Sequence, residues 1–429
     1  MRWSTIGTVF FALTATALAT AADLPSAPAK KVGMSPERLE AITRLSEEFV
    51  DEGKLPNVVT LVSRAGKVVH FSAVGQRGVE DPRPIKRDDL FRIYSMSKPI
   101  TAVAAMILYE EGAFQLRDPI SKFLPEFENA VVHVEGSDAT EPLAGPITMQ
   151  QLLSHTAGFS YGFSDDNPVD VALRARKIFA AKDLDEFVAK VAEVPLRFQP
   201  GKQWHYSLAV DLTGAVVERI AGQSFDVFLK ERIFAPLQMD DTFFSVPAEK
   251  RGRFLPNHSW DGEAGKLVSF VEDGYPIYEN ATFFSGGAGL VSTAMDYLKF
   301  AEMVRRGGEL NGARILSPKT IRFMTKNHLP GAVAAIGRGE SPSNTLGGGS
   351  YGFGFGLGFG VSMDPVRSGI IGSLGEYSWG GAAGTIFWID PVEELVVVAM
   401  TQLMGSPWPL RDQLKTLTNA ALIEINEPL

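Results

Sequence analysis

Strand-like segments at both ends of the chain, with helix-like segments between them, constrain the fold most strongly. Residues 58–62 and 68–71 are apolar and flank an Arg-Ala-Gly-Lys turn, as in an antiparallel hairpin. Residues 385–389 and 395–400 form a second such pair around Asp-Pro-Val-Glu near the C-terminus. We therefore expect one antiparallel sheet that takes its strands from both ends of the chain.

The segments next to these strands have helical spacing. Residues 36–55 place apolar side chains on one side, and Ser35 followed by Pro36 predicts an N-cap with proline at the first helical position. Residues 410–425 predict a closing helix. The sequence thus predicts an α+β fold, an antiparallel sheet flanked by terminal helices, with an inserted and mainly helical domain at residues 116–280. The α/β domain would combine residues 22–115 and 281–429.

The first 21 residues have the features of an export signal. Arg2 is followed by an uncharged apolar stretch, residues 6–19, and then by the small residues Ala-Thr-Ala. This pattern predicts a secretory signal peptide, residues 1–21, because a membrane span needs roughly 20 apolar residues and this stretch is shorter. We expect an exported protein, periplasmic or secreted, without a stable membrane anchor. The sequence indicates no oligomeric state.

Composition excludes several classes of function. The chain has 429 residues, no cysteine and a formal net charge of −9. An acidic chain without runs of Lys and Arg is not expected to bind nucleic acid. The six histidines form no pair at metal-ligand spacing, so we expect no metal site.

The glycine- and phenylalanine-rich residues 346–361 predict a sheet element or ordered loop with a closely packed neighbour. They predict no phosphate cradle, and we expect no cofactor.

The stretch Ser95-Met96-Ser97-Lys98 precedes Pro99 and an apolar run, residues 100–108. Residues three apart share a helix face, so Lys98 can reach the Ser95 oxygen. Pro99 crowds the carbonyl four residues before it, so the helix cannot begin before Ser95. The field of the helix N-terminus and burial both disfavour an ammonium ion, which lowers the pKa of Lys98 and makes it a candidate base. Taken alone, so short a pattern also occurs by chance on solvated helices.

Two distant segments complete a pattern with this pair. Tyr206 lies just before a predicted helix, and Trp379-Gly380-Gly381-Ala382 precedes the C-terminal strand pair. Together with residues 152–158 and 286–293, their order and spacing resemble the penicillin-recognising serine hydrolases. That superfamily includes class C β-lactamases, D,D-peptidases and family VIII carboxylesterases, and the resemblance spans nearly the whole chain after the predicted signal.

The resemblance implies a role for each matched residue. Ser95 would be the acylated nucleophile, and Lys98 and Tyr206 would share the base role, with the Tyr206 oxygen facing Lys98. The main-chain N–H groups of Ser95 and Ala382 would form an oxyanion hole, in which each donor contributes roughly 3 to 4 kcal/mol. The resemblance also implies a substrate-binding strand, formed by Trp379, Gly380 and Gly381.

Two departures from the β-lactamase pattern bear on the substrate. The chain has Trp379-Gly380-Gly381 in place of Lys-Thr-Gly and Ser207-Leu208 after Tyr206 in place of x-Asn. It thus lacks the cation that pairs with a substrate carboxylate and an amide that binds an acylamino group. Both departures favour a short-chain carboxylesterase acting on small ester molecules. The alternatives are a β-lactamase or D,D-peptidase/D-aminopeptidase acting on a β-lactam or peptide, and a slowly deacylating penicillin-binding module.

Ser160 and Ser350 offer a different nucleophile, because both lie in Gly-x-Ser-x-Gly sequences. An α/β-hydrolase elbow needs an apolar strand before that serine and a helix after it, and neither site has both. We therefore do not expect either serine to be the nucleophile. His155 is interpreted as a loop tether that acts through hydrogen bonds rather than as a triad base.

Overall fold

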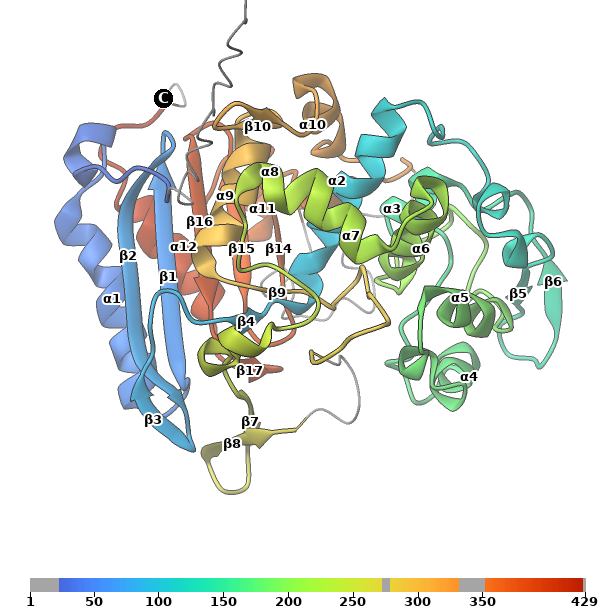
Figure 1. Cartoon of the computed structure of the whole chain (residues 1–429), viewed down its shortest axis with the longest axis horizontal. Coiled ribbons are helices and arrows are strands. Elements are labelled where there is room, and N and C mark those ends of the chain that lie inside the picture. Colours follow the sequence, from blue (N-terminus) through green and yellow to red (C-terminus); the bar gives the residue numbers. More distant parts are fainter. Residues whose placement is uncertain (1–22, 272–277, 332–351, 427–429) are drawn as a thin grey trace, which may run out of the picture.

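The computed structural model describes residues 23–271, 278–331 and 352–426. The predicted signal peptide, residues 1–21, lies outside the described residues. Figure 1 shows a sheet with helices on both faces and, beside it, a lobe made mainly of helices.

The described residues form an eight-stranded antiparallel sheet in the order β12-β13-β14-β15-β16-β1-β2-β3. The N-terminal and C-terminal segments meet at its centre, where Val59 of β1 pairs with Met400 of β16. This confirms the predicted sheet. Its strands are β1 (Asn57–Arg64), β2 (Lys67–Gly78), β3 (Asp81–Pro84), β12 (Phe353–Phe355), β13 (Gly360–Ser362), β14 (Tyr377–Gly380), β15 (Ile386–Asp390) and β16 (Leu395–Met400).

Local sequence explains the two predicted hairpins. Ala65 and Gly66 both have positive φ, 51° and 72°, as the tight turn between β1 and β2 requires. Between β15 and β16, Asp390 Oδ1 accepts the main-chain N–H groups of Val392 and Glu393, at 2.9 and 3.1 Å. An aspartate that caps its own turn in this way fixes where the second strand begins.

Helices cover both faces of the sheet. On one face, α1 (Pro36–Asp51) and α12 (Leu410–Ala420) pack on inward-facing side chains such as Trp388 and Val397. On the other, α2 (Ser97–Glu110) and α9 (Ala294–Arg305) pack on the alternate residues of the same strands (Figure 1). The terminal helices are those that the sequence predicts. Both end sooner than predicted, at residues 51 and 420.

The helical lobe packs against α2, whose residues 97–108 are all buried. An apolar helix of this kind has to lie inside the protein, as the sequence indicated. The lobe contains α3 (Met149–Leu153), α4 (Pro168–Ala175), α5 (Leu184–Ala192) and α6 (Ala209–Ala221). From it, α7 (Phe225–Leu229) and α8 (Ala235–Leu237) lead back toward α9 (Figure 1).

The segment 116–280 also contains short strands that the sequence did not predict. It includes the strand pairs β5 (Val131–His133) with β6 (Thr140–Pro142), and β7 (Asn257–Asp261) with β8 (Lys266–Phe270). These strands have at most five residues and carry polar side chains, so no alternating pattern revealed them. β7 also pairs in parallel with β17 (Leu403–Met404), so residues before 280 already contact the C-terminal part of the chain.

Short elements complete the fold. They are β4 (Phe91–Arg92) with β9 (Val291–Ser292), β10 (Glu309–Leu310) with β11 (Ala313–Arg314), α10 (Pro318–Met324) and α11 (Pro365–Ser368). In the described part of the glycine-rich stretch, residues 352–361, the chain forms β12 and enters β13, which agrees with the predicted sheet element. Residues 346–351 lie outside the described residues. At Gly358, where φ is 85°, an added Cβ would overlap the Cβ of Ala102 on α2. Glycine therefore permits the close approach between this stretch and α2.

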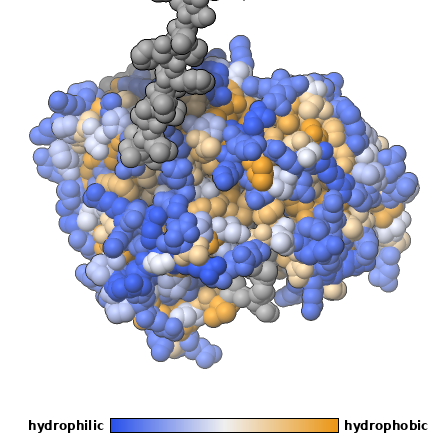
Figure 2. Space-filling view, viewed as in Figure 1, coloured by the Kyte–Doolittle hydropathy of each residue, from blue (hydrophilic) through white to orange (hydrophobic). Residues whose placement is uncertain are grey.

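The surface is mostly hydrophilic in the view of Figure 2, and apolar side chains show mainly near its middle. None of the described helices combines the length and apolar character that a membrane-spanning helix requires.

Candidate active site

Ser95 lies in a short 3-10 turn, Tyr94–Met96, directly before α2 begins at Ser97. Pro99 is the third residue of the helix, where no N–H is needed. The helix does not begin before Ser95, as predicted. Tyr94 has a φ of 42°, an unusual value for a residue with a side chain. Its hydroxyl accepts a hydrogen bond from Asn257 Nδ2 at 2.8 Å, which helps to hold the turn.

The structure brings the three predicted catalytic side chains together. Tyr206 OH donates to Ser95 Oγ at 2.6 Å, and Lys98 Nζ donates to the same oxygen at 3.2 Å. Tyr206 comes from the loop before α6, on the helical lobe, whereas Ser95 and Lys98 lie at the start of α2. Ser95 is partly exposed and the other two side chains are buried. The site therefore lies where the lobe meets the α2 start.

Lys98 donates three hydrogen bonds to described groups: Ser95 Oγ, Tyr161 OH at 3.0 Å and the main-chain oxygen of Gly287 at 2.8 Å. Lys98 and Tyr206 share the Ser95 oxygen as a hydrogen-bond partner, and Lys98 Nζ lies 4.6 Å from the centroid of the Tyr206 ring. That the Tyr206 oxygen faces Lys98 stays a prediction. Burial lowers the pKa of Lys98 to about 7, against the opposing effect of Asp211. A substantial fraction of Lys98 is thus neutral at pH 7.

Tyr206 has the opposite electrostatic character. Burial raises the pKa of its phenol, and the hydrogen bond with Ser95 only partly offsets this effect. The phenol is therefore protonated at neutral pH. Of the two predicted base residues, Lys98 can accept the serine proton at that pH, and Tyr206 can donate one.

Ala382 lies in the turn between β14 and β15, which packs against the segment leading into Ser95. Thr385 Oγ1 donates to the main-chain oxygen of Ile93 at 3.3 Å, and an added Cβ at Gly381 would overlap that oxygen. Among the main-chain hydrogen bonds of the described residues outside helices and strands, none is donated by Ser95 or Ala382. Their role as an oxyanion hole stays a prediction.

Trp379 packs behind Tyr206 and is only 1% exposed. Its ring centroid lies 5.5 Å from that of Tyr206 and 5.2 Å from that of Phe355. The indole thus supports the phenol and presents almost no surface of its own. Direct substrate contact by Trp379 remains a prediction.

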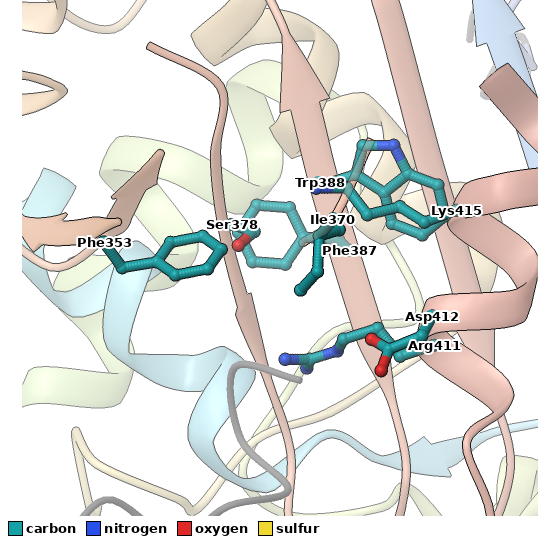
Figure 3. Close-up of a pocket in the computed structure, with 8 residues that line it drawn as sticks. All are labelled: Phe353, Ile370, Ser378, Phe387, Trp388, Arg411, Asp412 and Lys415. Atoms are coloured by element: carbon teal, nitrogen blue, oxygen red, sulfur yellow. The ribbon is translucent and has the colours of Figure 1, made fainter. Parts of the chain in front are cut away.

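The guanidinium of Arg411 lies against Gly380, and no pattern in the sequence predicted this cation. An added Cβ at Gly380 would overlap Nη2 of Arg411, a residue of α12, and burial lowers the pKa of Arg411 to about 10. Figure 3 shows the guanidinium pointing from α12 toward the strand that carries Ser378. A small pocket there is lined by Phe353, Ile370, Ser378, Phe387, Trp388, Arg411, Asp412 and Lys415. Nothing in the spacing of the sequence links α12 to this strand.

The competing serine and the histidine have structural partners. Ser160 is buried in a loop and its Oγ lies 2.9 Å from His205 Nε2. No strand precedes Ser160 and no helix follows it directly, so it does not form a nucleophile elbow. His155 Nδ1 lies 3.2 Å from Ser207 Oγ and accepts the Ser207 N–H at 3.3 Å, as a loop tether would. Ser350 lies outside the described residues.

Tyr161 was not predicted and contacts the centre of the site. It follows Ser160 directly, and its hydroxyl accepts from Lys98 and donates to Asp211 Oδ2 at 3.4 Å. Its ring stacks on that of Phe163, with centroids 4.9 Å apart, and Phe163 is 70% exposed. In the sequence, the only indication of a role for Tyr161 was its position shortly after the matched motif at residues 152–158.

Comparison with known proteins agrees with this geometry. The Beta-lactamase family model matches residues 42–421. Esterase EstB of Burkholderia gladioli is 31% identical over 404 residues, covering 89% of this chain and 94% of EstB. A putative D-alanyl-D-alanine carboxypeptidase of Escherichia coli is 24% identical, covering 88% of this chain and 85% of its own.

Among solved structures, EstCE1, described as a hydrolase with promiscuous acyltransferase activity, superposes with a TM-score of 0.74. It is 26% identical and the match covers 89% of this chain and 98% of EstCE1. The fold, the site geometry and these matches together identify the chain as a member of the Beta-lactamase family and a penicillin-recognising serine hydrolase.

Proposed function

We propose that the chain is a carboxylesterase that hydrolyses short-chain esters through an acyl-enzyme on Ser95. The observation that carries this proposal is the position of Ser95 Oγ, 2.6 Å from the Tyr206 phenol and 3.2 Å from an amine whose pKa is about 7. A hydroxyl so placed has a base to remove its proton and an acid to protonate the leaving group.

The proposed reaction has two halves. Neutral Lys98 takes the proton of Ser95 as its oxygen attacks the ester carbonyl, and the N–H groups of Ser95 and Ala382 stabilise the oxyanion. The ester C–O bond breaks, Tyr206 gives its proton to the departing alcohol, and the proton held by Lys98 restores the phenol. Water then attacks the acyl carbonyl and loses a proton to Lys98. The bond between the acyl carbon and Ser95 Oγ breaks, Lys98 returns that proton to Ser95 and the acid leaves.

The surroundings of the site support an apolar ester. Trp379 occupies the position where a substrate-pairing lysine would lie, and Phe163 extends the aromatic face that begins at Tyr161. An aromatic edge of this kind binds hydrocarbon better than charge. EstB is named as an esterase, which agrees with this substrate class.

One observation favours a second candidate, hydrolysis of β-lactams or D-alanyl peptides. The Arg411 guanidinium lies against Gly380 and could pair with the carboxylate of such a substrate. The Escherichia coli relative carries a carboxypeptidase name.

Turnover of p-nitrophenyl butyrate, a chromogenic cephalosporin and a D-alanyl-D-alanine peptide should be compared under one set of conditions. The ester proposal requires the highest kcat/KM for the butyrate, and a higher value for either other substrate would overturn it.

The nucleophile is tested by replacement. Ser95→Ala should abolish ester hydrolysis, whereas Ser160→Ala, which removes a buried hydroxyl bonded to His205, should leave most of it. Loss of turnover in a folded Ser160→Ala variant, with Ser95→Ala active, would show that the nucleophile was misassigned.

We also propose that the chain is exported and loses residues 1–21. The apolar stretch and the small residues before residue 22 support this proposal. N-terminal sequencing of the protein recovered from a host periplasm or medium should begin near Ala22. An intact Met1 in that fraction would contradict it.

A further inference from the structure

Asp211 is a fully buried carboxylate, 0% exposed, that the reaction described above does not use. It is the third residue of α6, near the helix N-terminus, where a negative charge is favoured. Oδ1 accepts hydrogen bonds from Ser285 Oγ and, at 3.0 Å, from the N–H of Gly287. Oδ2 accepts from Tyr161 OH at 3.4 Å. Burial raises the pKa of Asp211, and the charge of Lys98 and these three donors act against that rise. The contacts therefore favour the charged carboxylate.

Two of the groups bound by Asp211 are also partners of Lys98. Tyr161 OH accepts from Lys98 Nζ while it donates to Asp211, and Gly287 offers its oxygen to Lys98 and its N–H to Asp211. An added Cβ at Gly287 would overlap the Asp211 carboxylate, so glycine is required for this contact. Of the three described groups that accept hydrogen bonds from Lys98, only Ser95 has no hydrogen bond with Asp211.

The charges around Lys98 are few. Asp211 on α6 raises its pKa against the effect of burial. The other titratable groups that face it are Tyr161, Tyr206 and His155, from the loops after α3 and before α6. Burial and the Lys98 charge hold the pKa of His155 well below its usual range, so His155 is neutral. Asp211 is thus the charged group that opposes the desolvation of Lys98.

We propose that Asp211 is a positioning residue that acts on Lys98 through Tyr161 and Gly287, holding the amine toward Ser95 and setting the pH at which it becomes neutral. This inference rests on the proposed role of Lys98 as base. A carboxylate that only filled space could be replaced by its amide without changing the pH response. A carboxylate that holds an ammonium ion could not, because its charge favours the protonated amine.

The test is the pH dependence of Ser95 phosphonylation by a fluorophosphonate, followed by mass spectrometry. In this reaction the Ser95 oxygen bonds to phosphorus, fluoride leaves and the serine proton passes to Lys98. The wild-type rate should rise with pH to a plateau, with a midpoint near 7. In Asp211→Asn the midpoint should fall by about 1 pH unit or more, the usual effect of removing a nearby opposite charge.

Asp170→Asn is the matched control. Asp170 is also a buried aspartate and accepts the N–H groups of Gly162 and Ser164, but it has no contact with Lys98. Its midpoint should stay at the wild-type value. If Asp211→Asn does not fold, Tyr161→Phe tests the same link, since it removes the hydroxyl between Lys98 and Asp211, and its midpoint should also fall.

The possible results separate the two proposals. Wild-type protein that is not labelled on Ser95 would overturn the proposed function itself. Labelling with a midpoint near 7 that does not move, or moves up, in folded Asp211→Asn would overturn only the role of Asp211. A lower plateau with an unchanged midpoint would show a structural role alone.

Discussion

Replacing Tyr206 with phenylalanine removes one oxygen from the site and little else. The Tyr206 ring packs against Tyr161, His155 and Trp379, with centroids 5.3, 5.0 and 5.5 Å away, and phenylalanine retains those contacts. The oxygen that is lost donates to Ser95 Oγ at 2.6 Å. The effect of the change is therefore chemical rather than one of packing.

The size of the effect depends on the leaving group. Lys98 stays 3.2 Å from Ser95 and still accepts its proton, so attack on the carbonyl continues. Departure of an alcohol such as ethanol needs a proton, and losing a positioned acid costs about 10² to 10⁴ in rate, or about 2.7 to 5.4 kcal/mol. p-Nitrophenolate leaves without a proton, so its ester should be affected much less by the loss of Tyr206.

The assay compares kcat/KM for ethyl butyrate and p-nitrophenyl butyrate in the wild type and in Tyr206→Phe. Tyr297→Phe is the matched control, because its buried hydroxyl donates to the main-chain oxygen of Met96 at 2.9 Å, next to Ser95. That variant should change both rates equally. Equal losses on the two esters in Tyr206→Phe, or full activity, would refute the role of the phenol as acid.

Three further predictions follow from the same geometry. Because only neutral Lys98 can act as base, kcat/KM should fall tenfold per pH unit below about 7, and a flat profile from pH 5 to 8 would contradict this. Phe163→Ala should lower kcat/KM for p-nitrophenyl hexanoate about fourfold more than for the acetate, because about fourfold corresponds to the free energy of burying one methylene group. Equal losses on the two esters would exclude Phe163 from the acyl site. Gly358→Ala, forced against Ala102 at positive φ, should lower the free energy of unfolding by more than 1 kcal/mol in urea titrations. An unchanged midpoint would show that the contact relaxes freely.

Much of the fold followed from the sequence because its strongest signals are local. The hairpin at Ala65-Gly66 and the buried helix after Pro99 each carry their own turn or period. The strands within residues 131–142 and 257–270 are short and mix polar with apolar residues, and they depend on tertiary partners. No pattern of period two could have revealed them.

The residues of the candidate site also differ in whether local sequence could predict them. Ser95 and Lys98 are one helical turn apart, and Tyr206 was found through a resemblance in motif order. Tyr161 and Asp211 act through contacts between the loop after α3, α6 and the turn at Gly287, which no spacing in the sequence encodes. Side chains that support a site from distant segments need the fold before they can be recognised.

In the proposed reaction the Ser95 hydroxyl carries the acyl group during turnover, and trapping of the acyl-enzyme tests this directly. The enzyme is mixed with excess p-nitrophenyl acetate, quenched in acid within the first turnover, and digested for peptide mass spectrometry. An acetyl group should be found on Ser95 in the wild type and none in Ser95→Ala. An acetyl group on Ser160 or Ser350, with Ser95 unmodified, would contradict this prediction.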